Sequence, residues 1–339
     1  MRRLSNRRGM VLIFALWVVG ILTILAVSVA AGIRQKIFLV QRLDERSRMN
    51  NLLHSAVKKA AGYIHQEMEV SDFEFTPDVK MHLLNNTGEL TNIMLKNDRA
   101  AIGYIPVSQD DKSMHWGVVD EESKINLNKT DNITLTNLLT NVLKMKDEDA
   151  SKLALSLLDW RQEGTSEITG FYGDDYYSNL DHPYPKKSAD YECLDEILLV
   201  KGMTKEIYDK LVNYVTIYGD GAVNINTAPE EVLEAMGITE ELADKILMVR
   251  RGKDGIDGTA DDRIFSKTYE ITAVIANVVP INLLEARQID ILNMRGLLTT
   301  DSFYYSITAA GKLSSRSTAQ SVHAIYSARD DKIVYWNER

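Results

Sequence analysis

The sequence predicts an α+β protein: a long N-terminal helix packs on an antiparallel sheet, and a large insertion, expected to be all-α, interrupts that sheet. Three observations lead to this prediction. Residues 10–33 carry no charged side chain, and a helical period continues from there to about residue 67. Residues 98–119 and 301–337 show the alternation that is typical of strands. Residues 120–295 between them repeat their apolar positions with helical spacing.

Composition limits the partners that the body of the protein can bind. The 339 residues are 45% hydrophobic and 26% charged, which is ordinary for a globular protein, and the formal net charge is -9. Because nucleic-acid binding needs clustered Lys and Arg against the phosphates, this acidic balance argues against a nucleic-acid partner. The single cysteine, Cys193, excludes an internal disulfide and a thiolate zinc cluster.

The N-terminal apolar run is long enough to span a membrane. Its 24 residues give a helix of about 36 Å, against a hydrocarbon core of about 30 Å. Four arginines and no acidic residue precede it: Arg2, Arg3, Arg7 and Arg8. By the positive-inside rule they keep the N-terminus in the cytoplasm, so a single pass through the inner membrane places everything after Ile33 in the periplasm. The alternative is a secretory signal cleaved near Gly32, which so long an apolar run disfavours.

One helix is expected to continue past the membrane. No Pro or Gly interrupts residues 33–61. A helix over residues 10–67 would be about 85 Å long. Its amphipathic second half and the first part of the α/β domain together make up residues 34–119. Its apolar stripe consists of Ile37, Val40, Met49, Leu52, Leu53, Ala56, Val57, Ala60 and Ile64.

The C-terminal residues 296–339 are expected to complete the sheet. Three antiparallel strands are predicted there, at residues 302–310, 317–328 and 332–337. One face of the first strand carries Phe303, Tyr305, Ile307 and Ala309.

Two related passages lie within the insertion. Residues 124–128 (KINLN) and 223–227 (VNINT) each follow an acidic loop and precede an apolar-periodic helix, which indicates an internal duplication. After the second passage, Thr227 and Glu230 predict a capping box with Pro229 in the first helical turn.

The leader, residues 1–9, resembles a type III (prepilin) signal, because it is short and basic and ends in Gly9 before a membrane-spanning helix. The resemblance implies that a prepilin peptidase cleaves between Gly9 and Met10 and that the new amine is methylated. Most pilins carry a glutamate at the fifth mature position, which pairs with the N-terminal amine of a neighbouring subunit, and this sequence has Phe14 there. A prepilin-like subunit without that glutamate resembles the minor pseudopilin K of the type II secretion system, which caps the pseudopilus. The alternative is that Phe14 is an ordinary lipid-facing residue.

The order of several short motifs is also similar to that of the pseudopilin K family. They are Asp159 with Trp160, the acidic and aromatic residues 171–177, the Pro-Tyr-Pro loop at 183–185, Gly202 with Met203, and the Asn-Thr-Ala run at 226–228. The resemblance implies a pilin-like fold and a mechanical, non-enzymatic role. It also implies assembly with other minor pseudopilins at the filament tip, which primes growth by the major pseudopilin for protein export.

Part of the insertion supports a competing interpretation. Residues 194–219 and 224–275 also resemble helix-hairpin-helix or SAM-like units, which often bind DNA phosphates. A membrane-anchored, competence-type DNA receptor is therefore the alternative. Residues 201–270 carry nine Lys and Arg against fourteen Asp and Glu, so their net charge has the wrong sign for phosphate binding.

The sequence shows no motif that indicates an enzyme. Its six histidines form no HExxH pair, and it contains no Gly-x-Ser-x-Gly elbow or phosphate-binding glycine loop. Asp159 and Glu163 have the i, i+4 spacing of a carboxylate pair on a helix. A solvated helix end explains that pair equally well, and Trp160 beside it is expected in the core.

An acidic, glycine-rich loop predicts a structural calcium site. Oxygen ligands on a bent loop suit Ca²⁺, which accepts about 6 to 8 oxygens and would relieve the repulsion between close carboxylates. The expected ligands are Asp254, Asp257, Thr259, Asp261 and Asp262. A second cluster, Asp174, Asp175 and Asp181, is a further candidate. The alternative is a solvated acidic turn, and the resemblance to pseudopilin K favours the ion.

Overall fold

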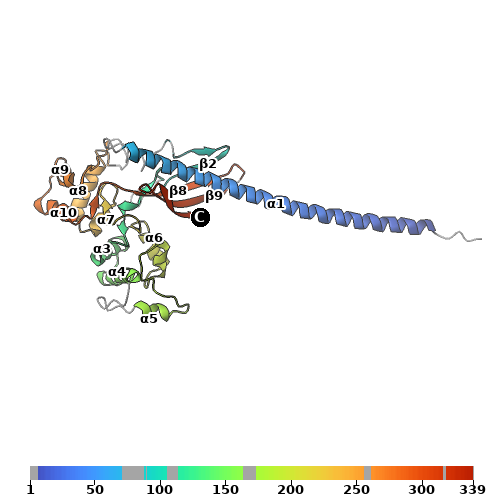
Figure 1. Cartoon of the computed structure of the whole chain (residues 1–339), viewed down its shortest axis with the longest axis horizontal. Helices are drawn as coiled ribbons and strands as arrows, with labels where there is room; N and C mark the ends of the chain where they lie inside the picture. Colours follow the sequence, from blue (N-terminus) through green and yellow to red (C-terminus); the bar gives the residue numbers. More distant parts are fainter. Residues whose placement is uncertain are drawn as a thin grey trace, which may run out of the picture.

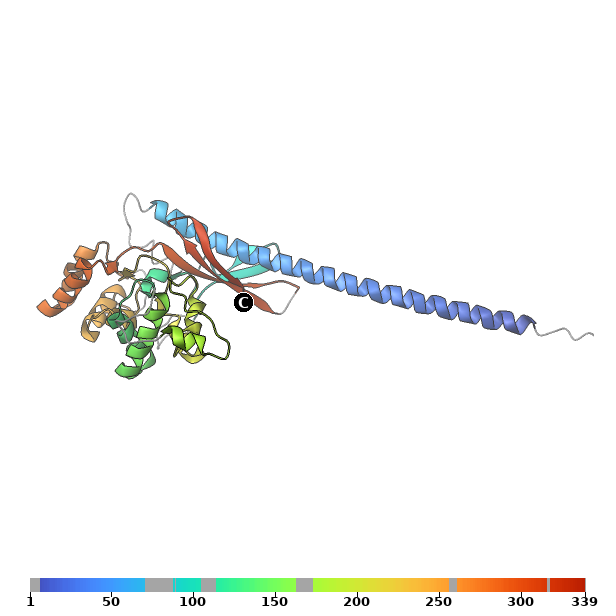
Figure 2. The same cartoon turned by 60° about the horizontal axis from the view of Figure 1, so that its bottom comes forward.

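The computed structural model describes residues 7–70, 88, 90–104, 114–162, 173–255, 261–315 and 318–338, and only the backbone of residues 7–9, 67–70 and 173–175. One helix, α1 (Arg7–Val70), projects from a body formed by a sheet and shorter helices (Figures 1 and 2). Its 64 residues make it about 96 Å long. The long continuous helix that the sequence predicts is therefore confirmed.

The buried part of α1 begins further along the chain than predicted. Ile37 and Val40 are 52% and 63% exposed, and burial begins at Met49, which is 1% exposed. The predicted stripe therefore starts about three turns too early. Periodicity shows that a helix has an apolar side, but it does not show where the sheet begins to cover that side.

An antiparallel sheet lies against α1. In order, its strands are β1 (Ile93–Leu95), β2 (Asp98–Ile102), β8 (Tyr304–Lys312), β9 (Ala319–Ser327) and β10 (Lys332–Glu338). A sixth strand, β3 (Val119–Asp120), pairs with β8 beyond the end of β2. The three predicted C-terminal strands are thus confirmed. β1 was not predicted, because three residues between turns are too few to show an alternation.

The core between α1 and the sheet follows the predicted pattern. Tyr305, Ile307 and Ala309 of β8 are buried and face α1 together with residues of β9, whereas Phe303 precedes the strand. The α1 residues in this core are Met49, Leu52, Leu53, Ala56, Val57, Ala60 and Ile64. Burying these apolar side chains, each worth roughly 1.5–3 kcal/mol for the larger ones, holds the helix on the sheet.

The insertion, residues 121–301, consists of two consecutive helical units. The first helical unit contains β4 (Ile125–Asn126), α3 (Asn132–Leu143), α4 (Asp147–Arg161), α5 (Gly173–Ser178), η2 (Leu194–Leu199), α6 (Lys205–Leu211) and β5 (Val215–Thr216), after the short η1 (Glu121–Ser123). The second helical unit contains β6 (Val223–Asn224), α7 (Glu230–Ala235), α8 (Glu240–Arg250), η3 (Thr268–Glu270), α9 (Ile271–Ala276), α10 (Leu283–Met294) and β7 (Leu298–Thr299).

The insertion is not all-α as predicted. In each unit the strand that begins it pairs in parallel with the strand that ends it, β4 with β5 and β6 with β7. These pairs have only two residues per strand, so they are too short to show an alternation in the sequence. Since β7 pairs with β6, the insertion extends a few residues past the expected limit at residue 295.

One asparagine in each helical unit makes the same pair of hydrogen bonds to the backbone of a later residue in that unit. Asn128 donates Nδ2 to the carbonyl of Tyr191 at 3.0 Å and accepts its N–H at 2.8 Å. Asn226 makes the same two bonds with Phe265, at 3.0 and 2.8 Å. Tyr191 and Phe265 are themselves buried in the core of the insertion. This matched pair of contacts supports the internal duplication.

An arginine at the end of the second helix also repeats. Arg161, the last residue of α4, donates Nη2 to the carbonyl of Thr130 at 2.7 Å. Arg250, the last residue of α8, donates Nη1 to the carbonyl of Ala228 at 2.6 Å. Each arginine thus satisfies a carbonyl of the turn that leads into the first helix of its unit.

The predicted capping box at residues 227–230 is wrong. α7 begins at Glu230 with Pro229 as its N-cap residue, and no side chain caps it. Thr227 instead donates Oγ1 to the carboxylate of Asp120 in β3, at 2.5 Å. The threonine oxygen is used in the contact between the insertion and the sheet, which a local sequence signal cannot show.

Candidate functional site

The first functional feature is the bare apolar half of α1. Within α1, Met10–Gln66 contains a stretch long and apolar enough to cross a membrane, with a mean hydropathy of 2.9 in its most apolar window. None of that window is buried in the protein. Phe14 is 71% exposed, so the side chain at the fifth predicted mature position points away from the helix into its surroundings. Gly9 and Met10 both lie within the helix.

The second feature is the acidic loop that follows α8. Asp254, Asp261 and Asp262 bring one carboxylate oxygen each to within 4.8 Å of one another. Arg263 N–H donates to the carbonyl of Arg250 at 3.0 Å and so closes the loop at its base. The structure therefore brings together three of the five predicted calcium ligands. Asp257 and Thr259 lie outside the described residues.

Asp261 also organises the backbone of this loop. Its Oδ2 accepts the N–H of Lys253 at 2.6 Å and the N–H of Asp254 at 3.3 Å. Gly252 has φ +63, and a Cβ there would lie 2.4 Å from the carbonyl oxygen of Asp261. Only glycine therefore allows the two sides of the loop to approach so closely.

The acidic loop has the donor set of a hard-cation site. Carboxylate oxygens are the ligands that Ca²⁺ prefers, at about 2.3–2.6 Å, and they tolerate irregular geometry. Three carboxylates this close repel one another, and a divalent cation would cancel that repulsion. The second predicted cluster is less defined, since Asp181 is exposed and the side chains of Asp174 and Asp175 are outside the described residues.

The predicted carboxylate pair on α4 has a structural role at Asp159. Asp159 and Lys186 form an ion pair at 3.3 Å, and each side chain is only 2% exposed. Trp160 is buried beside them, as predicted, with the Tyr177 and Tyr184 rings 5.2 and 6.2 Å from its own. Glu163 lies outside the described residues. Lys186 was missed, because nothing in the sequence shows that a lysine 27 positions away faces this helix.

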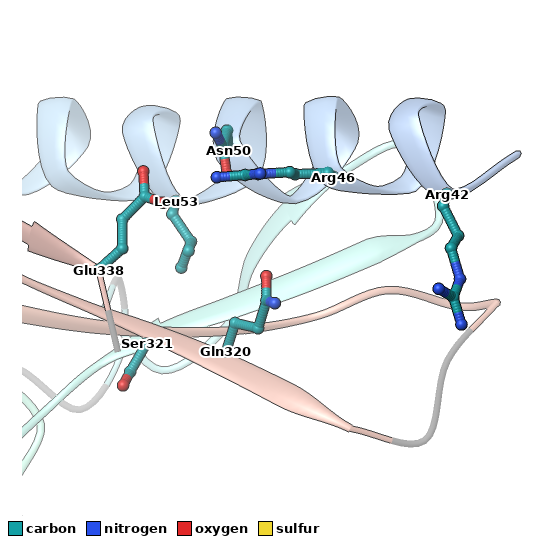
Figure 3. Close-up of a pocket in the computed structure, with 7 residues that line it drawn as sticks. All are labelled: Arg42, Arg46, Asn50, Leu53, Gln320, Ser321 and Glu338. Atoms are coloured by element: carbon teal, nitrogen blue, oxygen red, sulfur yellow. The ribbon is translucent and has the colours of Figure 1, made fainter. Parts of the chain in front are cut away.

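A hollow of about 550 Å³ lies between α1 and the sheet (Figure 3). Two arginines of α1, Arg42 and Arg46, face it from one side, and Glu338 of β10 faces it from the other. Its remaining lining residues are Asn50, Leu53, Gln320 and Ser321. Its lining therefore combines two cations and one carboxylate with three uncharged polar side chains and one leucine.

The comparison with solved structures shows the fold. Five solved chains match this one. A chain of the crystal structure of the GspK-GspI-GspJ complex from the enterotoxigenic Escherichia coli type 2 secretion system is similar, with a TM-score of 0.64 and 15% sequence identity. The similarity covers 88% of this chain and 99% of that chain, so it must include most of the insertion.

The comparison with protein families concerns the junction and the first helical unit. Residues 118–220 match the family described as type II secretion system (T2SS), protein K. No curated protein matches the sequence. Neither match is to a DNA-binding protein, so the competence-type alternative has no support. Residues 118–220 are therefore similar to the type II secretion system protein K family, within a chain whose fold is shared with the solved GspK-GspI-GspJ complex chain over most of its length.

Proposed function

We propose that the protein is a minor pseudopilin that sits at the tip of a pseudopilus and primes its assembly for protein export. The observation that supports this proposal most directly is that the apolar half of α1 and the insertion lie at opposite ends of the molecule. The apolar N-terminal half of α1 projects at one end, and the helices of the insertion lie at the other (Figures 1 and 2). In a filament built on parallel α1 helices, such a subunit adds its bulk above the sheet, where a further subunit would otherwise stack.

The uncharged Phe14 supports the same position. A glutamate there would attract the amine of a subunit above, because both charges would otherwise be stranded in an apolar environment. Phe14 offers no such attraction. The tip is the one place in a filament where that contact is not needed.

The partners follow from the same geometry. Large apolar side chains of α1 remain exposed beyond residue 33, including Ile37, Phe38, Leu39, Val40 and Leu43, each at least 52% exposed. They surround the helix, so covering them needs apolar helices on more than one side. The similar solved chain belongs to a complex of three different subunits, GspK, GspI and GspJ. We therefore propose that α1 bundles with the helices of other minor pseudopilins and that the major pseudopilin adds beneath.

Processing and topology complete the proposal. The basic leader remains in the cytoplasm, a prepilin peptidase cleaves between Gly9 and Met10, and the new amine is methylated. α1 then holds the protein in the inner membrane by one pass, and the body lies in the periplasm. The role is mechanical rather than catalytic.

The acidic loop is proposed to bind one structural Ca²⁺. Asp254, Asp261 and Asp262 would supply carboxylate oxygens, and Asp257 or Thr259 in the intervening segment would complete the set. The ion would fix the loop that closes the second helical unit, in a protein whose single cysteine provides no disulfide. Asp174 and Asp175 of α5, with Asp181 just after that helix, are a further candidate site in the segment that follows α4 in the first unit.

Filament assembly in cells tests the priming role. When the major pseudopilin is overproduced, deletion of this protein should lower the number of surface filaments and abolish secretion, and the intact gene should restore both. Filaments that form in unchanged number without the protein would contradict a priming role. A variant that lacks residues 121–301 but retains α1 and the sheet would separate the contribution of the insertion from that of the anchor.

A further inference from the structure

The chain crosses between the sheet and the insertion at one buried junction. It leaves the sheet after β3, through Asp120, Glu121, Glu122 and Ser123, which are 2% to 6% exposed. It returns immediately before β8, through residues 302–303. Three carboxylates that follow one another in the sequence therefore lie buried where the two parts of the body meet.

Two of these carboxylates are well satisfied by polar partners. Asp120 Oδ2 accepts from Asn224 Nδ2 at 3.0 Å, Thr227 Oγ1 at 2.5 Å and Ser302 Oγ at 2.6 Å. Glu121 forms an ion pair with Lys124 at 2.5 Å and also accepts from the Thr216 hydroxyl. These contacts join β3, both helical units and the start of β8. They also provide the buried carboxylates of Asp120 and Glu121 with hydrogen-bond donors.

Glu122 is held differently. Its Oε2 accepts one hydrogen bond, from the backbone N–H of Phe303, at 2.5 Å. Its Oε1 lies close to Gly219: a Cβ added to Gly219 would be only 2.7 Å from this oxygen. Gly219 has φ +83, so the close approach and the backbone conformation both require glycine. Water therefore cannot solvate the carboxylate from that side.

We propose that Glu122 is a proton-controlled latch between the insertion and the sheet. When its carboxyl group is neutral, the backbone N–H of Phe303 and the turn at Gly219 stay packed against it, and when the group is ionised these two contacts loosen. The charge of a buried carboxylate favours exposure to water, and the described part of the chain offers this one a single hydrogen-bond donor and no ion pair. Ionisation therefore favours a state in which the Glu122 side chain swings out and the Phe303 N–H is released. Such a latch would operate whatever role the protein has in secretion.

The surroundings of Glu122 favour its neutral form. Burial is the main cause that raises its pKa, to about 7, and the negative charges of Asp120 and Asp220 raise it further. The Phe303 hydrogen bond and the charge of Arg329 act in the opposite direction. Tyr305 of β8 also lies close enough to interact electrostatically with Glu122, and its own raised pKa keeps it neutral in this range.

The sign of the pH dependence follows from this shift. Because the pKa of Glu122 is higher in the closed state than in an open, solvated one, closure is favoured fully below the ordinary pKa of 4.5. That preference is lost as pH rises toward 7 and is gone above it. Between pH 6 and pH 8 the opening equilibrium of the junction should increase about tenfold.

Hydrogen exchange of the full chain in detergent tests the latch. The protection factor of the Phe303 amide, corrected for intrinsic exchange, should fall about tenfold between pH 6 and pH 8. In Glu122→Gln it should change less than about twofold, because glutamine stays neutral. Glu241→Gln, the same change at an exposed position on α8, should behave like the unmodified protein.

A second variant keeps the test valid if Glu122→Gln fails to fold. Asp220→Asn retains Glu122 but removes a neighbouring negative charge that raises the pKa of Glu122 in the closed state. With that pKa lowered, the loss of protection at Phe303 should be complete at a lower pH, so the fall between pH 6 and pH 8 should be smaller than in the unmodified protein. A Phe303 protection factor that is independent of pH in the unmodified protein would overturn the proposal, as would an equal fall in Glu122→Gln or in Asp220→Asn.

Discussion

Replacing Lys186 by methionine removes the cation that faces Asp159 inside the first helical unit. Both side chains are 2% exposed and their charged atoms are 3.3 Å apart, so the variant leaves a carboxylate buried without its counter-charge. Removing one partner of such a pair typically costs about 3–5 kcal/mol. Much of that cost is the penalty on the remaining charge rather than the strength of the pair itself.

The double variant separates those two contributions. Asp159→Leu combined with Lys186→Met replaces the pair by apolar side chains of similar size, and such replacements are often neutral or stabilising by about 1–4 kcal/mol. The double variant should therefore recover most of the stability that Lys186→Met alone loses. The coupling between the two positions is the quantity to be measured.

Denaturant unfolding of the detergent-solubilised chain measures these changes. The fluorescence of Trp160 reports on the site, because its ring lies 5.2 Å from Tyr177 in the same aromatic cluster. Lys152→Met is the matched control, since Lys152 pairs with Glu148 on the exposed face of α4 and should contribute little. The reasoning is refuted if Lys186→Met is no more destabilising than Lys152→Met, or if the two changes at the buried pair are additive.

Three further predictions concern the anchor and the acidic loop. N-terminal sequencing of the membrane-extracted protein should begin at Met10, whereas a start near Gly32 would indicate a conventional secretory signal. Free Ca²⁺ at about 100 times its Kd should stabilise the folded state by about 2.7 kcal/mol. Asp261→Asn should blunt this response while the exposed Asp290→Asn should not, and an identical melting curve in millimolar calcium and in excess chelator would exclude the site. Phe14→Glu should leave secretion unchanged or mildly reduced, because no subunit above needs that charge, and increased secretion would contradict a capping role.

The elements that could be predicted from the sequence are those with a long, regular pattern. Residues 10–33 and the stripe from Met49 to Ile64 have enough turns to show a helix, and β8, β9 and β10 have enough residues to show alternation. The limits of these elements against their neighbours were less predictable. Ile37 illustrates this, since it continues the periodic stripe but lies before the sheet begins.

The contacts that define the insertion join residues far apart in the sequence. Asn226 bonds to Phe265 and Thr227 to Asp120, and neither partner has a local signal that reveals it. The acidic loop was predictable because its carboxylates are close in sequence, whereas the Lys186 to Asp159 pair depends on how a later loop returns to α4. Short-range chemistry was therefore predictable, and chemistry created by the tertiary fold was not.

The position of the protein in the filament tests the central proposal most directly. Gold-labelled antibody against the insertion, residues 121–301, applied to sheared filaments and imaged by electron microscopy, would show where the subunit lies. A minor pseudopilin that caps the filament predicts a label at one end of each filament and a stoichiometry that does not increase with filament length. Label distributed along the whole length would contradict the proposed role.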